Sequence, residues 1–551
     1  MANITIPRKQ FEREIGKLDK EMQNRIAMFG TTLERIDEEE IELEIFPDRP
    51  DLLSFQGFKR AFLAFLDKKT GLKKYKLFPP EKNYVVKIDS SVKKVRPYTV
   101  CAIVKNLKLN SEKIKEIIDI QEKIHTTIGR KRKKLAIGIY PLENITLPIT
   151  FQAREPDKIK FTPLEMNREL NGLQILQRHP AGRDYAHLLS GKTKFPIFTD
   201  KNKNILSMPP IINSHKTGKI TEKTKEIFIE CSGFDEEILS KCLNILATTF
   251  SDMGGKVYQM RVKDKKTKKT PDLTPEKKEI SLKNINKLLG IDLKEKEIKK
   301  YLERMGYNYD KKTKTLEIPA WRTDILHEVD LIEDIAISYG YENFEPEIPE
   351  ISTIGEEDRK ETIKRKIAQI LAGIKMLEIS NYHLTKKQDQ IDKMNMSEKD
   401  SENIIETENS KTEYKILRKD ISHYCLKILS ENADSQYPQK IFEAGRVFYL
   451  NKEDKIKEVE KLSAAIAPSN FTDLKQVLNY LGLMLEMNFE YSEPEKTPPY
   501  FIEGRTAEIF LGKERIGQIG EIHPKILKNW KIKMPTALFE INLDKLIEKI
   551  N

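Results

Sequence analysis

The pattern of apolar and polar residues is clearest between Leu316 and Phe344, LEIPAWRTDILHEVDLIEDIAISYGYENF. A short apolar run, Leu316 to Trp321, predicts a strand, and the polar corner Arg322-Thr323-Asp324 follows it. Asp324 is the expected N-cap of the next helix, because its carboxylate can accept a hydrogen bond from a free amide of the first turn. Apolar residues then recur at spacings of three and four, which predicts a helix whose buried face holds Val329, Ile332, Ala336 and Tyr339.

The same helix carries three acidic residues, Asp330, Glu333 and Asp334, on one patch of its surface. Like charges at this spacing repel by a few tenths of a kcal/mol per pair, so a cation would offset their clustering. A site made only of oxygen ligands suits Mg²⁺. Acidic residues in the first half of an exposed helix also interact favourably with the helix dipole and need no metal. The spacing leaves both interpretations open.

This stretch has a counterpart near the N-terminus. Leu43 to Leu53 aligns with Leu316 to Leu326 without a gap, and both copies keep the Arg and Asp of the corner. We therefore predict that residues 3–66 and 278–341 are two copies of one module, each built as helix, helix, strand, corner, helix. At the positions of the three acids the first copy has Gly57, Arg60 and Ala61, so the acidic patch belongs to the second copy alone.

Composition adds a few limits. The chain has 551 residues, enough for roughly four domains, and its 97 basic and 86 acidic residues leave a net charge of +11. This modest positive balance favours an anionic partner such as RNA. The four cysteines form no CxxC motif, which predicts a reducing compartment rather than a zinc site or disulfides. No window approaches twenty apolar residues, so we expect a cytoplasmic protein without membrane spans.

Residues 85–262 read as a mixed α/β domain. Its basic run, Gly129 to Lys134, is equally compatible with a phosphate contact and with a solvated loop, and the candidate RNA contacts are Arg130, Lys131, Arg132, Lys133 and Lys134. Small polar residues fall at strand ends, where a pocket could be built, although turns and caps place the same residue types there. These pocket candidates are Asn213, Ser214, Glu230 and Ser232.

The predicted domain boundaries follow from these signals. A Lys-rich stretch at 263–277 is expected to be an exposed linker, and prolines near 346 mark the start of a last mixed domain. The divisions are 1–84, 85–262, 263–277, 278–346 and 347–551.

Five motifs in order give the chain a family resemblance. It resembles the beta subunits of phenylalanyl-tRNA synthetases, of the shorter archaeal and eukaryotic type. The resemblance spans nearly the whole length, through Phe46 to Leu53, Thr127 to Arg130 with Ala136 to Gly138, Trp321 to Tyr341, Phe442 to Phe448, and Gly520 to Pro524.

The resemblance implies a heterotetramer of two alpha and two beta subunits that joins phenylalanine to tRNA(Phe) using ATP and Mg²⁺, with the aminoacylation site in alpha. It also implies an α+β multidomain fold with two related helix-helix-strand-helix modules, the second B5-like. Residues 347–551 would form an antiparallel-sheet domain similar to a class II synthetase core that has lost catalysis. In agreement, residues 356–551 contain no convincing Gly-rich triphosphate loop and no class II arginine motif.

Two site predictions also come from the resemblance. The Mg²⁺ positions of the family correspond to Asp324, Asp330, Glu333 and Asp334. Residues 85–262 resemble the B3/B4-type editing domain, which hydrolyses tyrosine mischarged onto the tRNA, and Asn213, Ser214, Glu230 and Ser232 are the candidates for its pocket. The alternatives are a freestanding tRNA-editing hydrolase and a non-catalytic RNA-binding scaffold.

Overall fold

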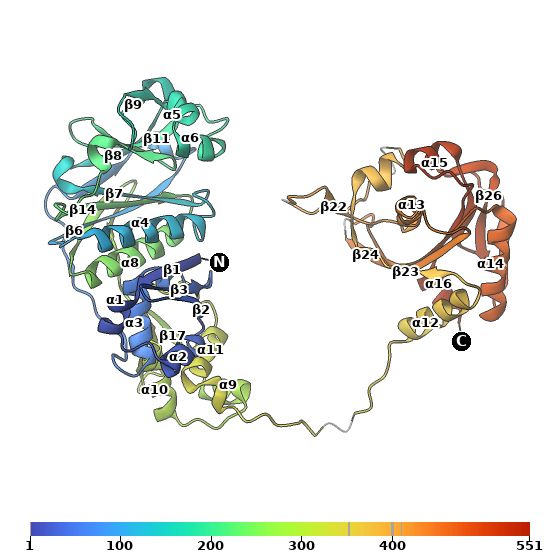
Figure 1. Ribbon diagram of the computed structural model, residues 1–551, viewed down its shortest axis with the longest axis horizontal. Helices are drawn as coiled ribbons and strands as arrows, with labels where there is room; N and C mark the ends of the chain where they lie inside the picture. Colours follow the sequence, from blue (N-terminus) through green and yellow to red (C-terminus); the bar gives the residue numbers. More distant parts are fainter. Residues whose placement is uncertain (1, 351–352, 398–401, 409, 454, 551) are drawn as a thin grey trace. The chain divides into compact units, whose positions relative to one another are not determined.

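The computed structural model describes residues 2–350, 353–397, 402–408, 410–453 and 455–550. The chain divides into two compact units, Met1–Ile348 and Pro349–Asn551 (Figure 1). Both units combine helices with β-sheets, so the chain is a mixed α/β protein with several domains and several sheets.

The two sequence repeats have the same order of elements. The first comprises β1 (Ala2–Pro7), α1 (Arg8–Glu14), α2 (Lys20–Met28), β2 (Thr32–Ile36), β3 (Glu40–Ile45), η1 (Pro50–Leu52) and α3 (Phe55–Phe65). The second comprises β17 (Glu276–Glu279), α9 (Leu282–Leu289), α10 (Glu295–Arg304), β18 (Asn308–Asp310), β19 (Thr315–Ile318), α11 (Glu328–Tyr339) and η6 (Tyr341–Asn343). Their sheets are ordered β1-β3-β2 and β17-β19-β18, so the third strand is central in each.

Each repeat therefore holds three strands where the sequence predicted one. The additional strands lie at sheet edges. In β17 the sequence Glu-Lys-Lys-Glu is mostly exposed, and β2 is exposed along most of its length. Charged residues are common on edge strands, and they hide the alternation by which a strand is recognised in sequence.

The helix after the second corner begins later than predicted. Helix α11 starts at Glu328 with His327 as its N-cap, and Asp330 accepts hydrogen bonds from the amides of Leu326 and His327, both at 2.7 Å. The prediction that Asp324 is the N-cap is wrong, because the guanidinium of Arg322 binds its carboxylate instead.

The buried face of α11 is also rotated from the predicted one. Leu331, Ile332, Ile335 and Ala336 are buried, whereas Val329 is 59% exposed. The prediction that Val329 is buried is wrong. Spacings of three and four fit both sets of residues, so the sequence alone could not choose between two overlapping faces.

The domain between the repeats is built on one large sheet. Eleven strands between residues 77 and 270 follow the order β13-β12-β11-β8-β5-β15-β6-β14-β7, with β4 and β16 also paired to β15. The strands are β4 (Leu77–Phe78), β5 (Val85–Ile88), β6 (Tyr98–Lys105), β7 (Leu135–Pro141), β8 (Ile149–Arg154), β11 (Phe195–Thr199), β12 (Ile205–Met208), β13 (Ile212–Asn213), β14 (Ile227–Gly233), β15 (Lys256–Lys263) and β16 (Thr267–Thr270).

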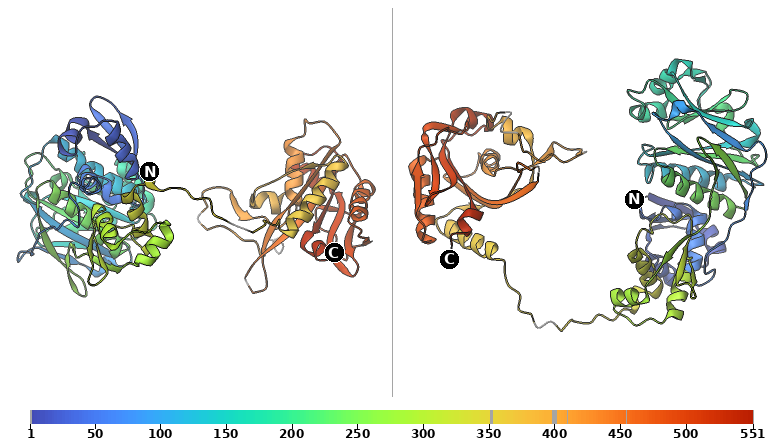
Figure 2. Two further views of the ribbon diagram at one scale, coloured as in Figure 1. Left: turned by 90° about the horizontal axis from the view of Figure 1, so that it is seen from below. Right: turned by 180° about the vertical axis from the view of Figure 1, so that it is seen from behind.

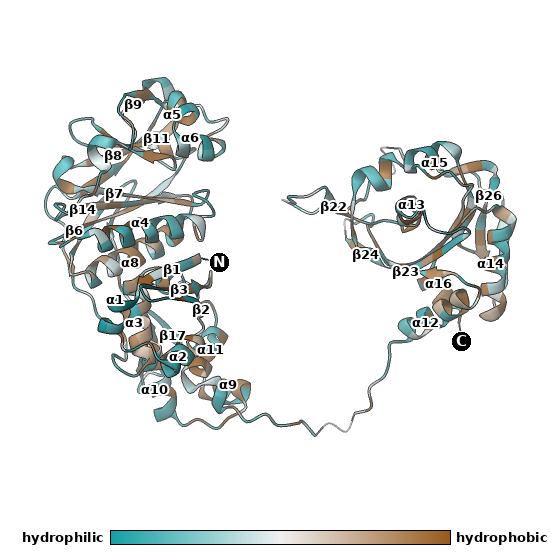
Figure 3. Ribbon diagram, in the orientation of Figure 1, coloured by the Kyte–Doolittle hydropathy of each residue, from teal (hydrophilic) through white to brown (hydrophobic). Residues whose placement is uncertain are grey.

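The sheet curls so that its two ends face each other as layers (Figure 1). Helices α4 (Ser111–Thr126) and α8 (Glu236–Asp252) cover the outside of the layer formed by β6, β14 and β7. This layer is rich in hydrophobic residues, whereas α4 carries many hydrophilic ones (Figure 3). The opposite layer carries the small strands β9 (Lys160–Phe161) and β10 (Leu170–Asn171), the helices α5 (Gly172–Arg178), α6 (Pro180–Tyr185) and α7 (His215–Gly218), and the short turns η2 (Ser90–Val92), η3 (Leu142–Asn144), η4 (Pro156–Lys158) and η5 (Ala186–Leu188).

The predicted linker at 263–277 is partly regular structure. Thr267–Thr270 forms β16, which pairs with β15, and the hydroxyl of Thr270 donates to the carbonyl of Cys101 at 2.7 Å. The prediction of a linker over the whole stretch is therefore wrong. Lys268 and Lys269 on this strand are exposed, and exposed lysines are equally common in solvated linkers, which is why the sequence predicted one here.

The second unit is built on a large curved sheet with helices on both faces (Figure 2), and β21 and β22 form a separate pair. Within its described residues seven strands follow the order β20-β23-β24-β28-β27-β26-β25. Its elements are α12 (Arg359–Gly373), β20 (Leu377–Glu378), β21 (Leu384–Lys386), η7 (Gln388–Asp392), β22 (Tyr414–Leu417), α13 (Ser422–Glu431), β23 (Gln439–Leu450), β24 (Ile456–Ala467), α14 (Phe471–Met484), β25 (Phe489–Ser492), β26 (Phe501–Leu511), β27 (Glu514–Ile522), α15 (Pro524–Trp530), β28 (Ala537–Asn542) and α16 (Leu543–Ile547). Helices α12, α14 and α16 share one apolar core on the sheet, and α13 and α15 share another.

All four cysteines are buried and free. Among the described residues, no helix is both long enough and apolar enough to cross a membrane.

Candidate functional site

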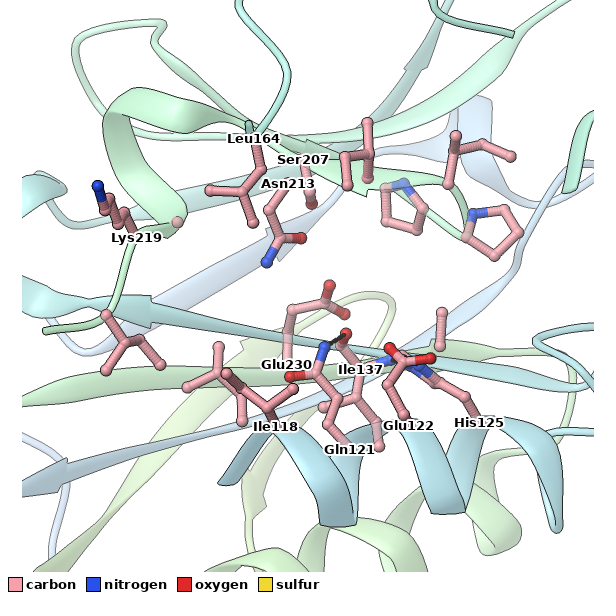
Figure 4. Close-up of a pocket in the computed structure, with 18 of the residues that line it drawn as sticks. Ile118, Gln121, Glu122, His125, Ile137, Leu164, Ser207, Asn213, Lys219 and Glu230 are labelled. Atoms are coloured by element: carbon pink, nitrogen blue, oxygen red, sulfur yellow. Dashed lines mark hydrogen bonds and ion pairs between the residues drawn. The ribbon is translucent and has the colours of Figure 1, made fainter. Parts of the chain in front are cut away.

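A pocket of about 390 Å³ lies between the two layers of the large sheet (Figure 4). We call it the interlayer pocket. Helix α4, β7 and β14 form one side, and β12, β13 and α7 form the other. Its volume is typical of a site for a small ligand. Apolar walls come from residues such as Ile118, Ile137 and Ile211, and its polar side chains include Gln121, Glu122, His125, Arg132, Ser207, Asn213, His215 and Glu230.

Glu230 is the central polar residue of the interlayer pocket. It is 1% exposed, and its side chain rises from β14 toward Ser207 and Asn213 on the opposite layer (Figure 4). Its Oε1 lies 3.3 Å from the hydroxyl of Tyr140, while its Oε2 is buried without a hydrogen-bond partner among the described residues. Burial raises the pKa of Glu230 to about 8, although the charge of Arg96 acts in the opposite direction. At neutral pH the carboxyl is therefore mostly protonated, and it can both donate and accept a hydrogen bond.

Gly138 provides the space for this carboxyl. It lies opposite Glu230 on the adjacent strand β7. A Cβ placed on Gly138 would lie 2.1 Å from the hydroxyl oxygen of Tyr140 and 2.6 Å from Oε1 of Glu230. Any side chain here would displace one of these groups, so the pocket requires glycine at this position.

Tyr140 connects the two layers. Its hydroxyl donates to Oγ of Ser207 at 2.7 Å and lies 3.4 Å from Oδ1 of Asn213. Sequence reasoning missed Tyr140 and Ser207. The available signal was Gly138 inside the apolar strand 135–140, since a glycine in a strand often marks the close approach of another group, and Tyr140 lies two residues further on the same face.

A hydrogen-bonded set at one end of the pocket fixes its wall. The amide of Ile137 donates to Nε2 of His125 at 2.8 Å, which leaves the proton on Nδ1, 3.2 Å from Oε1 of Glu122. Nη2 of Arg132 donates to the same oxygen at 2.7 Å. Burial lowers the pKa of His125. Because both its ring nitrogens are engaged, His125 serves to position the wall rather than to accept a proton.

Comparison with known proteins identifies the family. Three family models match successive parts of the chain: the B3/4 domain at residues 81–251, the tRNA synthetase B5 domain at 278–341, and the Phenylalanyl tRNA synthetase beta chain CLM domain at 345–543. The phenylalanine–tRNA ligase beta subunit of Thermococcus sibiricus is 38% identical over 558 residues, covering 98% of both chains. The chain belongs to the phenylalanine–tRNA ligase beta-subunit family. The beta subunit of Methanosarcina barkeri is 35% identical and covers 99% of both chains.

A solved structure supports the fold of the first unit. An N-terminal fragment of the beta subunit from Pyrococcus horikoshii is 36% identical, with a TM-score of 0.59, and the match covers 61% of this chain and 99% of that one. In this member of the beta-subunit family, the residues named above for the interlayer pocket all fall within the part that the B3/4 model matches.

The structure brings two of the four predicted pocket residues together. Asn213 and Glu230 line the interlayer pocket of this beta-subunit family member, whereas Ser214 and Ser232 do not. Ser214 is buried at the start of α7, and its amide donates to the carbonyl of Leu206 at 2.7 Å. Oγ of Ser232 accepts a hydrogen bond from Nε of Arg96 at 3.1 Å. Both serines therefore have local structural partners.

Four of the five predicted RNA contacts are exposed. Arg130, Lys131, Lys133 and Lys134 project into solvent. Arg132 instead turns inward, where its Nη1 donates to the carbonyl of Ile211 at 2.8 Å and its guanidinium lies 4.5 Å from the ring of Tyr185. The exposed four are free to meet phosphates, and RNA contact stays a prediction.

The four predicted Mg²⁺ ligands are engaged within the B5-type module. Arg322 donates to both oxygens of Asp324, at 2.8 and 2.6 Å, and to Asp334 at 2.8 Å. Burial acts to raise the pKa of Asp324, but Arg322 lowers it to about 2. Asp330 caps α11, and Glu333 accepts a hydrogen bond from the hydroxyl of Tyr341 at 2.7 Å.

These four carboxylates are engaged by separate protein partners and are not gathered around one point in this structure. Among the described residues, no three His, Cys, Asp or Glu side chains are grouped so that they could hold an ion. Mg²⁺ binding by this family member stays a prediction, and no step of the function described below depends on it.

Proposed function

We propose that this chain is the beta subunit of a heterotetrameric phenylalanine–tRNA ligase and that its interlayer pocket hydrolyses tyrosyl-tRNA(Phe). A separate alpha subunit would attach phenylalanine to tRNA(Phe) with ATP, in a complex of two alpha and two beta subunits. The match to beta subunits over nearly the whole chain supports the assignment to such a complex. The observation that carries the hydrolytic role is the buried carboxyl of Glu230, with one unpaired oxygen in a small-ligand pocket.

Glu230 is suited to recognise a phenol. A buried polar atom without a partner costs about 1–3 kcal/mol, and a ligand hydroxyl that pairs with it removes that cost. The protonated carboxyl can exchange two hydrogen bonds with the hydroxyl of tyrosine. A phenylalanine ring in the same place would leave Oε2 unpaired. Sites built to bind a hydroxyl reject the analogue that lacks it, so the pocket would select tyrosyl over phenylalanyl esters.

The hydrolytic step would use a water molecule rather than a protein nucleophile. Oγ of Ser207 already accepts the hydrogen bond of Tyr140, and His125 has both nitrogens engaged. His215 lines the pocket and is exposed, so its imidazole is the group that we assign to hold and deprotonate the attacking water. The protein would thus position water and ester side by side.

The second unit supports placing aminoacylation in a partner. Residues 349–551 contain six arginines. Arginine is a residue of choice for binding phosphate groups such as those of a nucleoside triphosphate. Each one binds an acceptor of this chain. The pairs are Arg359 with Ile550, Arg365 with Glu357, Arg418 with Glu443, Arg446 with Glu460, Arg505 with Glu521, and Arg515 with Glu508. Arg418 and Glu443 are both almost fully buried, so this pair holds the fold together.

An exposed apolar stripe on α14 is a candidate contact for the alpha subunit. Tyr480, Leu483 and Met484 are 40%, 72% and 51% exposed, and their spacing of three and four residues places them on one side of the helix. Exposed apolar groups that cluster in this way commonly mark protein interfaces. We assign this stripe to the partner subunit.

The basic loop is a candidate contact for tRNA. Arg130, Lys131, Lys133 and Lys134 are exposed beside the B3/4 region, where they can neutralise phosphates. A tRNA ligase acts where translation takes place, and four free cysteines suit a reducing compartment, so we propose a cytoplasmic location.

Charging and deacylation assays on purified chains test the proposal. The chain alone and the chain with its alpha partner are incubated with ATP, phenylalanine and tRNA(Phe), and separately with preformed tyrosyl- and phenylalanyl-tRNA(Phe). We expect charging only when the partner is present. We expect tyrosyl-tRNA(Phe) to be hydrolysed and phenylalanyl-tRNA(Phe) to remain intact. Charging by this chain without a partner would refute the assignment of subunit roles.

A further inference from the structure

A second pocket lies where the two repeats meet the end of α8. We call it the junction pocket. Its volume is about 430 Å³, and it is lined by α3, the loop after it, Asp252 at the end of α8, and the corner of the second repeat. All these segments belong to the first unit. Among the residues that the structure describes, six Lys or Arg side chains and two acidic ones line it, namely Arg49, Lys59, Arg60, Lys69, Lys73 and Arg322 with Asp51 and Asp252.

Arg60 is fixed in the wall of the junction pocket by one end of its guanidinium. Nη1 donates to Oδ2 of Asp252 at 2.8 Å and to the hydroxyl of Tyr75 at 3.0 Å. The guanidinium lies 4.6 Å from the ring centre of Trp321 in the second repeat. The side chain is 7% exposed. Arg60 is thus held in one orientation by three elements.

The other edge of the Arg60 guanidinium is unsatisfied. Its Nε and Nη2 are both buried and have no hydrogen-bond partner among the described residues. Asp252 is engaged at Nη1 and also accepts from Lys73 at 2.6 Å, and Asp51 is held by Arg49. Two adjacent buried N–H groups of a cation cost free energy when they have no acceptor. A ligand that accepts hydrogen bonds from both removes this cost and so gains affinity.

Two neighbouring arginines show what this edge binds. Arg49 donates from Nε and Nη2 to the two oxygens of Asp51 at 2.9 and 3.0 Å. Arg322 makes the same pair of bonds to Asp324 at 2.8 and 2.6 Å. The corner of each repeat thus supplies an oxyanion to the Nε and Nη2 edge of an arginine. Arg60 lines the junction pocket, and no carboxylate of the described residues binds its Nε and Nη2 edge.

The number of donors that the junction pocket offers favours phosphate over carboxylate. A side-on arginine binds either group through two parallel hydrogen bonds. Most of these cations are already paired with carboxylates of the chain: Arg49 with Asp51, Arg322 with Asp324 and Asp334, Lys59 with Glu14, and Lys73 with Asp252. Lys69 lines the pocket and is exposed. A phosphate can accept from the arginine fork with two oxygens and from a lysine with a third.

We propose that the junction pocket binds a phosphate group, held through Nε and Nη2 of Arg60 and assisted by Lys69. The ligand is orthophosphate or the phosphate of a small organic ester. The site is separate from the proposed hydrolytic function, because no residue lines both pockets.

Titration of the full chain at constant ionic strength tests this proposal. Isothermal calorimetry is performed with inorganic phosphate, AMP and acetate, with chloride as the balancing anion. We expect saturable binding of phosphate at one site per chain and at least tenfold weaker binding of acetate. AMP competition with phosphate would identify an organic ester as a ligand, and no competition would restrict the site to the free ion. Phosphate heats that do not saturate, or acetate binding of equal strength, would overturn the proposal.

The Arg60→Lys variant tests the residue itself. Lysine keeps the charge but cannot make two parallel bonds, so we expect phosphate binding to weaken by at least about tenfold. Arg304→Lys is the matched control, because all three nitrogens of Arg304 bind carbonyls of Phe65 and Ser338 outside the pocket. Equal phosphate binding by Arg60→Lys and wild type would overturn the assignment.

Two further variants keep the test decisive. If Arg60→Lys does not fold, Lys69→Ala at an exposed position should still weaken phosphate binding, and unchanged binding would count against the site. Glu230→Gln should bind phosphate like wild type, so that failure of the phosphate site and failure of the proposed hydrolytic function give different results.

Discussion

Gly138 and Glu230 face each other on the adjacent strands β7 and β14, and a Cβ on Gly138 would lie 2.6 Å from Oε1 of Glu230. The same Cβ would lie 2.1 Å from the hydroxyl of Tyr140. The absence of a side chain at residue 138 therefore determines where the buried carboxyl of Glu230 and the phenol of Tyr140 can lie.

Gly138→Ala tests this spatial requirement. The added methyl group forces Glu230 and Tyr140 out of place, so we expect a loss of about 1–3 kcal/mol in the free energy of unfolding. We also expect tyrosyl-tRNA(Phe) hydrolysis to fall at least tenfold. Denaturant unfolding and deacylation assays measure the two effects. Gly373→Ala is the control, because a Cβ there meets no atom within 4 Å. A Gly138→Ala variant as active as wild type would show that the carboxyl need not occupy its observed position.

Glu230 predicts a pH dependence of stability. Its pKa in the folded chain is about 8, above the ordinary value of 4.5, so the folded state binds more protons than the unfolded state between these values. The free energy of unfolding should therefore fall as pH rises through this window. Glu230→Gln cannot titrate and should lack this fall. Between about pH 5 and about pH 9 we expect wild type to lose at least ~1 kcal/mol relative to the variant, since one pKa unit corresponds to ~1.4 kcal/mol. Parallel stability curves for the two proteins would contradict the burial of a protonated carboxyl.

The acidic residues of α11 predict a stability effect that does not depend on metal. Asp330 accepts two backbone amides at the start of the helix, so Asp330→Ala should lower the free energy of unfolding by about 1 kcal/mol. Glu333 is exposed and accepts a hydrogen bond from Tyr341, so Glu333→Ala should change the free energy of unfolding by less than about 0.5 kcal/mol. Both differences should be equal in Mg²⁺ and in chelator. Stabilisation of wild type by Mg²⁺ that either variant loses would instead establish the metal site.

The stripe on α14 predicts how the partner subunit binds. Leu483 is 72% exposed, so Leu483→Asp should leave the folded chain intact while placing a charge in the proposed interface. We expect co-purification with the alpha subunit to weaken at least tenfold, with an unchanged thermal midpoint of the isolated chain. Ile456→Asp, at another exposed apolar residue of the second unit, is the control. Equal retention of the partner by wild type and Leu483→Asp would move the interface elsewhere.

Repetition was the most informative sequence signal for the fold. Two stretches align through Arg49 and Asp51 and through Arg322 and Asp324, and in the structure each pair forms the same two-bond contact. The mispredicted details lie in elements with weak local signals. The edge strands β16 (Thr-Lys-Lys-Thr) and β17 (Glu-Lys-Lys-Glu) hold only polar residues, and Val329 satisfies a helical period without facing the core.

The candidate site was only partly visible in the sequence. Glu230 and Asn213 were recognisable as polar residues at strand ends, and both line the interlayer pocket. Ser207, Tyr140 and His125 come from three other elements, and only the curling of the sheet brings them together. Conversely, Ser214 and Ser232 are also polar residues at or just beyond the ends of strands, yet neither lines the pocket. Contacts between distant segments decide these cases, and a single sequence does not record them.

Deacylation by three forms of the chain tests the central claim most directly. Wild type, Glu230→Gln and Glu230→Ala are incubated with tyrosyl- and phenylalanyl-tRNA(Phe) near neutral pH. The amide of glutamine keeps one donor and one acceptor, as the protonated carboxyl does, so Glu230→Gln should retain tyrosyl hydrolysis within about tenfold. Glu230→Ala should lose about 10–100-fold, because about 1.5–3 kcal/mol of hydrogen bonding is removed. If Glu230→Ala hydrolyses the tyrosyl ester at the wild-type rate and still spares the phenylalanyl ester, Glu230 does not recognise the hydroxyl and the proposed role of the interlayer pocket is wrong.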